Sequence, residues 1–133
     1  MDKRFTYPSF SGIATFLRSP YILPEEASAG EYVVVGAPYD TTLGSRPGAR
    51  YAPNAIRQES GHFLYHLTAI DGEVIDVVTK KRMKSNMIGV VKDAGDLRVY
   101  PSNVAKTTES IAEGICQIVS AMAFPVTLGG DHY

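Results

Sequence analysis

The chain has 133 residues, and its 13 lysines and arginines nearly balance its 14 aspartates and glutamates, giving a net charge of -1 at pH 7. Such a charge predicts no broad attraction for nucleic acid or for an anionic membrane, so neither is expected as a partner. No apolar run approaches the ~20 residues of a membrane-spanning helix, and the N-terminus lacks a signal-type apolar stretch. The only cysteine is Cys116, which excludes an intramolecular disulfide and favours a reducing, cytoplasmic setting.

The first half of the chain predicts one buried strand followed by a helix. A short helical turn is expected at 13–17, within an irregular, proline-containing segment. Residues 31–37 are continuously apolar at their centre rather than alternating, which is typical of a central strand in a helix-covered parallel sheet. Gly48 is expected to adopt a backbone conformation that a Cβ disfavours. Pro53 suits the first turn of a helix, which is predicted to end near Gly61.

The second half predicts a further helix between buried strands. Short strands are expected at 74–78 and 87–91, and a final strand at 126–128, before two glycines that allow a sharp turn. A long helix is predicted over 104–122, capped by Ser102 or Asn103. Its apolar stripe consists of Val104, Ile111, Ile115, Ile118, Val119 and Met122. This order of elements is that of a wound α/β sheet.

Acidic and imidazole side chains follow two of these predicted strands. Asp93 and Asp96 come after the strand at 87–91, and Asp131 and His132 come after the last strand. The carboxyl ends of parallel strands are where ligands bind, so the four side chains would form a hard-metal environment if the two strands are neighbours. The alternative interpretation is that the first two aspartates cap turns and helix starts, and the residue types alone favour this alternative.

Other motif-based functions find less support in the sequence. No Gly-x-Gly-x-x-Gly follows the first strand, and the glycine-containing loop at 44–48 lacks the Lys-Ser/Thr pair of a phosphate-binding P-loop. His62 and His66 lie four residues apart and could share a helix face. Without a third ligand nearby, they are predicted to be packing or surface residues.

Five short motifs occur in a characteristic order: Gly12-Ile13-Ala14-Thr15-Phe16-Leu17-Arg18, Gly36-Ala37-Pro38-Tyr39-Asp40, residues 46–57, Asp93-Ala94-Gly95-Asp96 and Gly129-Gly130-Asp131-His132. Together they resemble the N-terminal half of the ureohydrolases, the arginase and agmatinase family. The first motif is similar to the N-terminal segment of the agmatinase and guanidinobutyrase branch. Each motif alone is weak, but five in register over nearly the whole chain are strong.

The resemblance implies a three-layer α/β fold with a parallel sheet of the arginase type, incomplete in this chain, so that residues 1–133 form the N-terminal portion of one domain. It implies a hydrolase that cleaves a small guanidino compound, agmatine or a guanidino acid, to urea and an amine. Two manganese ions would lower the pKa of a bridging water. His132 inherits a metal-ligand role, whereas Asp131, Asp93, Asp96, Gly129 and Gly130 would support the site without binding metal.

The family's other metal ligands lie in an Asp-Ala-His-x-Asp motif and a Ser-x-Asp-x-Asp motif, and neither motif occurs in this sequence. One imidazole cannot hold two manganese ions, so no catalytic set is complete and the chain alone is expected to be inactive. An exposed apolar edge strand would recruit a complementing chain or a homo-oligomer partner. The alternative hypothesis is a non-catalytic assembly or regulatory partner that keeps the family surface without its chemistry.

Overall fold

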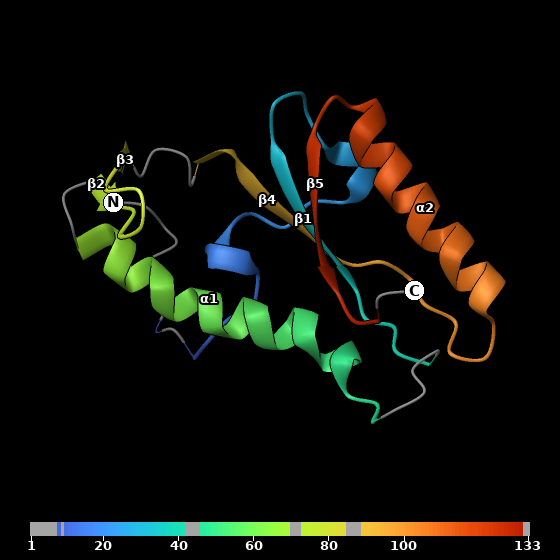
Figure 1. The fold of residues 1–133 in the computed structure, drawn as a ribbon. Coiled ribbons are helices and arrows are strands. Elements are labelled where there is room, and N and C mark those ends of the chain that lie inside the picture. Colours follow the sequence, from blue (N-terminus) through green and yellow to red (C-terminus); the bar gives the residue numbers. More distant parts are fainter. Residues whose placement is uncertain (1–7, 9, 42–45, 70–72, 85–88, 132–133) are drawn as a thin grey trace.

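The computed structural model of the protein describes residues 8, 10–41, 46–69, 73–84 and 89–131. Its main sheet has three parallel strands in the order β4–β1–β5, with β1 (Tyr32–Ala37) between β4 (Val91–Asp96) and β5 (Phe124–Gly129). The long helices α1 (Ala52–Ala69) and α2 (Val104–Ser120) lie on opposite sides of this sheet (Figure 1). The predicted α/β class with a helix-covered parallel sheet is confirmed.

The remaining elements are short. Single turns of 3-10 helix form at η2 (Phe16–Arg18), η3 (Pro24–Glu26) and η4 (Ala49–Tyr51). An antiparallel hairpin of β2 (Glu73–Ile75) and β3 (Arg82–Lys84) lies beyond the end of α1, away from the main sheet (Figure 1). The predicted strand at 74–78 is therefore too long. Val78 lies in the connecting turn because the Asp76 carboxylate accepts its N–H at 2.9 Å.

The hydrophobic core lies between the sheet and α2. Val33 and Val35 of β1 are fully buried there with Ile118 of α2, as members of a cluster that also contains Ala94, Leu97 and Ala123. Val34 alternates to the opposite face and is also buried, as expected for a central strand. Asn103 caps α2, because its side-chain oxygen accepts the Lys106 N–H at 2.9 Å.

The predicted apolar stripe of α2 is only partly correct. Ile118 is buried and Ile111 and Ile115 are packed against the core, whereas Val119 is 54% exposed. The helix ends at Ser120, two residues earlier than predicted, so Met122 lies outside it and is 74% exposed. Helical spacing alone therefore predicted too wide an apolar stripe.

Helix α1 continues past its predicted end. Gly61 is buried inside the helix, which runs on to Ala69, although glycine disfavours a helix interior. The reason is tertiary packing: Ser60 accepts the N–H of Leu17 at 2.8 Å, so η2 is attached to this part of α1. Contacts with a distant segment outweigh the local propensity at this position.

The strand predicted at 87–91 was placed too early, because only Val91 of the described residues in that range belongs to β4. Residues 85–88 lie outside the described residues, and β4 begins at Val91. The backbone stays extended further along the chain because residues 20–22 run beside it: Asp93 donates its N–H to the Pro20 carbonyl at 3.1 Å and accepts the Ile22 N–H at 3.0 Å. Asp93 and Asp96 are therefore part of the strand and do not follow it.

The core predicts a sharp contrast between two neighbouring residues of α2. Replacing Ile118 with Ala should lower the free energy of unfolding by about 2–5 kcal/mol, because it leaves a cavity between β1 and α2. Val119→Ala is the matched control and should cost less than about 0.5 kcal/mol at this exposed position. Thermal unfolding followed by circular dichroism at matched protein concentration measures both changes. Equal losses would contradict the placement of the core.

Candidate functional site

The carboxyl ends of the parallel strands β1 and β5 lie together at one end of the sheet. β1 is followed by Pro38, Tyr39 and Asp40, and β5 is followed by Gly130 and Asp131. The Asp131 N–H donates to the Tyr39 carbonyl at 2.6 Å, which joins the two strand ends. A Cβ on Gly130 would overlap that same carbonyl oxygen, so the second glycine of the motif is required by a close approach of two backbones.

Two polar atoms of the segments that follow β1 and β5 are buried without a hydrogen-bond partner among the described residues. They are the Tyr39 hydroxyl and the Asp131 Oδ2 atom. Because native proteins leave few buried polar atoms unpaired, such atoms mark places where an ion, a ligand or further polypeptide supplies the partner. Both belong to the segments that directly follow β1 and β5.

Asp40 organises the loop that leads from β1 to α1. Its buried carboxylate accepts the backbone N–H of Gly48 at 2.7 Å and that of Arg50 at 3.1 Å, and it forms an ion pair with the Arg50 guanidinium. The side-chain hydrogen bond from Arg50 lowers the pKa of Asp40 to about 2, against the opposing effect of burial. Gly48 has a φ of 148°, which confirms the conformation expected there.

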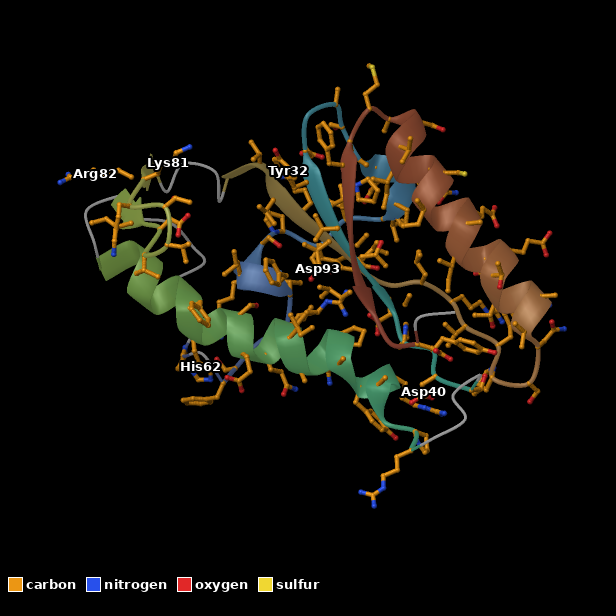
Figure 2. The ribbon with its side chains drawn as sticks, viewed as in Figure 1. Tyr32, Asp40, His62, Lys81, Arg82 and Asp93 are labelled. Atoms are coloured by element: carbon orange, nitrogen blue, oxygen red, sulfur yellow. The ribbon has the colours of Figure 1, made fainter. Side chains whose placement is uncertain are left out.

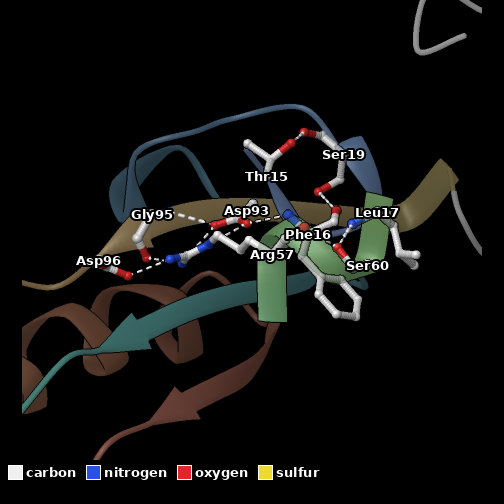
Figure 3. Close-up of polar contacts among 9 residues, drawn as sticks. All are labelled: Thr15, Phe16, Leu17, Ser19, Arg57, Ser60, Asp93, Gly95 and Asp96. Atoms are coloured by element: carbon white, nitrogen blue, oxygen red, sulfur yellow. Dashed lines mark hydrogen bonds and ion pairs between the residues drawn. The ribbon is translucent and has the colours of Figure 1, made fainter. Parts of the chain in front are cut away.

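A second buried ion pair lies in the middle of the molecule, around Asp93 (Figures 2 and 3). Arg57 of α1 donates two hydrogen bonds to the Asp93 carboxylate, from Nε at 2.9 Å and from Nη2 at 3.1 Å. It also donates to Asp96 at 2.5 Å and to the Gly95 carbonyl at 2.7 Å. Burial opposes the charge of Arg57, but hydrogen bonds and ion pairs with Asp93 and Asp96 raise its pKa.

Asp93 also holds the N-terminal segment. Its carboxylate accepts the Phe16 N–H at 2.7 Å and the Gly95 N–H at 2.8 Å, and the residue is fully buried (Figure 3). The bond from Gly95 matches the turn-capping interpretation, whereas the pairing with Arg57 was not predicted. Its signal in the sequence is the spacing of Pro53, Arg57 and Ser60, which places all three on one buried stripe of α1.

The structure does not bring the four predicted site residues together on neighbouring strands. β1 lies between β4 and β5, so the condition that would place Asp93 and Asp96 beside Asp131 is not met. His132 lies outside the described residues. Within those residues, no group of three or more histidine, cysteine, aspartate or glutamate side chains could hold a metal ion. His62 is exposed on α1, which agrees with the second of the two predicted alternatives, a packing or a surface residue.

Comparison with known proteins gives a consistent family match. The sequence model of the arginase family matches residues 30–133. The chain is 34% identical over 125 residues to the proclavaminate amidinohydrolase of Streptomyces clavuligerus. It is 31% identical over 126 residues to the guanidinobutyrase of Pseudomonas aeruginosa. Each match covers 94% of this chain and 36% of the relative, so the chain spans about a third of these relatives' length.

Solved structures agree with these sequence matches. A hypothetical agmatinase from Burkholderia thailandensis superposes with a TM-score of 0.73 at 25% identity, over 95% of this chain and 36% of that structure. The proclavaminate amidinohydrolase structure superposes with a TM-score of 0.72 at 32% identity, over 95% of this chain and 38% of that structure. No helix among the described residues has the length and apolar character needed to cross a bilayer.

Two adjacent glycines allow the close approach of the β1 and β5 ends to be tested, because only Gly130 contacts Tyr39. Gly130→Ala should destabilise the chain by about 1–3 kcal/mol, because the added Cβ forces the β1 and β5 ends apart. Gly129→Ala is the matched control, since a Cβ there meets nothing within 4 Å. Thermal unfolding of both variants measures the difference. Similar melting temperatures for the two would show that the backbones do not meet as described.

Proposed function

The chain belongs to the arginase family, and from that premise we propose that it forms part of a hydrolase that cleaves a small guanidino compound to urea and an amine. The candidate substrates are agmatine and guanidino acids. Relatives with nearly the same identity, between 31% and 34%, are a guanidinobutyrase, an agmatinase and a proclavaminate amidinohydrolase. Overall similarity therefore supports the class of substrate and does not choose one member of it.

The observation that carries this proposal is the position of the β1 and β5 carboxyl ends, which lie together at one end of the sheet. β5 ends there at Gly129, and Gly130 and Asp131 follow it at the carboxyl ends where α/β folds bind ligands. The buried Asp131 Oδ2 atom, which has no hydrogen-bond partner among the described residues, supports this placement. His132, next in the chain, is proposed as a metal ligand, with Asp131 and Gly130 fixing the backbone that presents it.

We propose that the complete enzyme binds two manganese ions. The described residues alone do not supply a set of ligands for them. Beyond β5 they contribute one unpaired carboxylate oxygen, Asp131 Oδ2, and they contain no cluster of metal-ligating side chains. Manganese prefers several carboxylate oxygens together with imidazole. The remaining ligands must therefore come from polypeptide other than the described residues. Asp93 and Asp96 are proposed to support the fold behind the site, because Arg57 occupies both carboxylates. A cytoplasmic location is proposed from the single cysteine.

A chimera tests the function. Residues 1–133 are fused ahead of the part of the Pseudomonas aeruginosa guanidinobutyrase that the match does not cover. With manganese, this chimera is expected to release urea from 4-guanidinobutyrate or agmatine. His132→Asn should reduce urea release at least 100-fold and lower the bound manganese measured by elemental analysis, because a ligand is lost. The unfused chain should release no urea and bind manganese weakly in equilibrium dialysis.

His62→Asn is the matched control, since this histidine is exposed on α1, and it should leave urea release unchanged. Undiminished activity and metal content in the His132→Asn chimera would refute the assignment of His132. A folded, manganese-loaded chimera without activity on any guanidino compound would instead favour the alternative of a non-catalytic assembly partner.

A further inference from the structure

A cavity of about 380 Å³ lies between the N-terminal segment and the middle of α1. One wall is formed by residues 10–15 and by Arg18, and the other by residues 57–59 and 61–62 of α1. None of these lining residues belongs to the segments that follow β1 and β5, so the cavity is separate from the candidate site described above. Small-molecule sites in proteins have volumes of roughly 300–1,000 Å³, so this cavity is large enough for a small ligand.

The wall contributed by the N-terminal segment is held in an unusual backbone conformation. Leu17 and Arg18 both have a φ of 50°, in the left-handed region that residues other than glycine rarely adopt. The Phe16 N–H donates to the Asp93 carboxylate at 2.7 Å. The Leu17 N–H donates to Ser60 Oγ at 2.8 Å, so the turn is fixed on both β4 and α1 (Figure 3). Such conformations persist where surrounding contacts fix them and are frequent at ligand sites, so Arg18 has a defined position on the cavity wall.

The Arg18 guanidinium keeps hydrogen-bonding capacity for a ligand. Its Nη2 atom donates to the carbonyl of Pro8 at 2.5 Å and to that of Ser11 at 3.0 Å, which closes the N-terminal loop. Its Nε and Nη1 atoms make no hydrogen bond with the rest of the described chain, and no carboxylate there pairs with the guanidinium. Free arginine donors on a cavity wall are well suited to a carboxylate, because the hydrogen bonds between the two are charge-assisted.

The opposite charge on the lining belongs to Glu59 of α1. This exposed side chain forms no hydrogen bond or ion pair with the other residues that the structure describes. Arg57 also lines the cavity, but Asp93 and Asp96 balance its charge. The lining therefore presents the Arg18 guanidinium and the Glu59 carboxylate, which are not paired with each other. A ligand that carries both charges satisfies both groups.

We propose that this cavity binds a small zwitterion, with its carboxylate at Arg18 and its ammonium or guanidinium group at Glu59. A ligand with a single charge satisfies one of the two groups and leaves the other without a partner. Guanidino acids are zwitterions, as are the amino acids that their hydrolysis releases. The cavity thus takes a substrate or product of the proposed reaction at a place away from the candidate metal site. This link to the reaction rests on the proposed function, whereas the binding of a zwitterion does not.

Isothermal titration calorimetry of the 133-residue chain without metal tests the proposal apart from catalysis. Glycine, 4-aminobutyrate and 4-guanidinobutyrate separate the two charges by different lengths, and at least one of them should bind saturably to a single site. Butyrate and butylamine carry one charge each and should bind at least about 10-fold more weakly than that zwitterion. Absence of saturable binding by all three zwitterions would overturn the proposal. Butyrate or butylamine binding as tightly as the best zwitterion would also overturn it.

Glu59→Gln is the decisive variant, because it removes one of the two charges and no hydrogen bond within the described part of the chain. It should keep the melting temperature, weaken binding of the zwitterion at least about 10-fold, and abolish the preference for the zwitterion over butyrate. Glu109→Gln, at an exposed position on α2, is the matched control and should bind the zwitterion normally. Equal affinities of these two variants would show that the zwitterion does not occupy this cavity.

Discussion

The paired charges of Arg57 and Asp93 are the interaction on which the arrangement of the chain depends. The two residues come from α1 and β4, 36 positions apart in sequence, and each is at least 95% buried. Asp93 also binds the backbone of η2 and of Gly95, so one carboxylate joins the N-terminal segment, the helix and the edge strand. Because both charges are removed from water, neither is tolerable without the other.

This pair also explains how the two faces of the sheet differ. The face toward α2 is an ordinary hydrophobic core built on Val33, Val35 and Ile118. The face toward α1 instead carries the Arg57–Asp93 ion pair, which joins α1 to β4. Buried ion pairs contribute little net stability compared with apolar packing, but they specify one arrangement of the elements that they join.

Sequence patterns predicted the parts of the fold that depend on local chemistry. The apolar run of β1, the Asn103 cap and the burial of Ile118 each follow from propensity or periodicity, and the structure confirms them. The beginning of β4 and the end of α1 were predicted wrongly. Aspartate is common where strands end and glycine where helices end, yet residues 20–22 hold Asp93 in β4, and Ser60, next to Gly61, accepts the Leu17 N–H. Periodicity carries no information about such partners.

In the candidate site too, some features follow from the local sequence and others depend on residues far away in the chain. The motif at 129–132 predicted a site at the carboxyl end of the last strand, because glycines after a buried strand allow the backbone to turn sharply. The contact of Gly130 with Tyr39 depends on how the ends of β1 and β5 meet, and the pairing of Asp40 with Arg50 depends on how the connection from β1 to α1 folds back on itself. The roles of Asp93 and Asp96 were interpreted from their spacing alone. Their main partner, Arg57, lies on a helix in which Pro53 and Ser60 are also buried.

A double-mutant cycle on Arg57 and Asp93 tests the central claim most directly. The free energy of unfolding is measured for Arg57→Met, Asp93→Leu and the double variant, at matched protein concentration. Each single variant leaves a buried charge without its partner and is expected to cost about 3–5 kcal/mol. The double variant should be less destabilised than the sum of the singles by at least about 2 kcal/mol. Losses that add within about 0.5 kcal/mol would show that the two residues act independently, and would contradict this account of the fold.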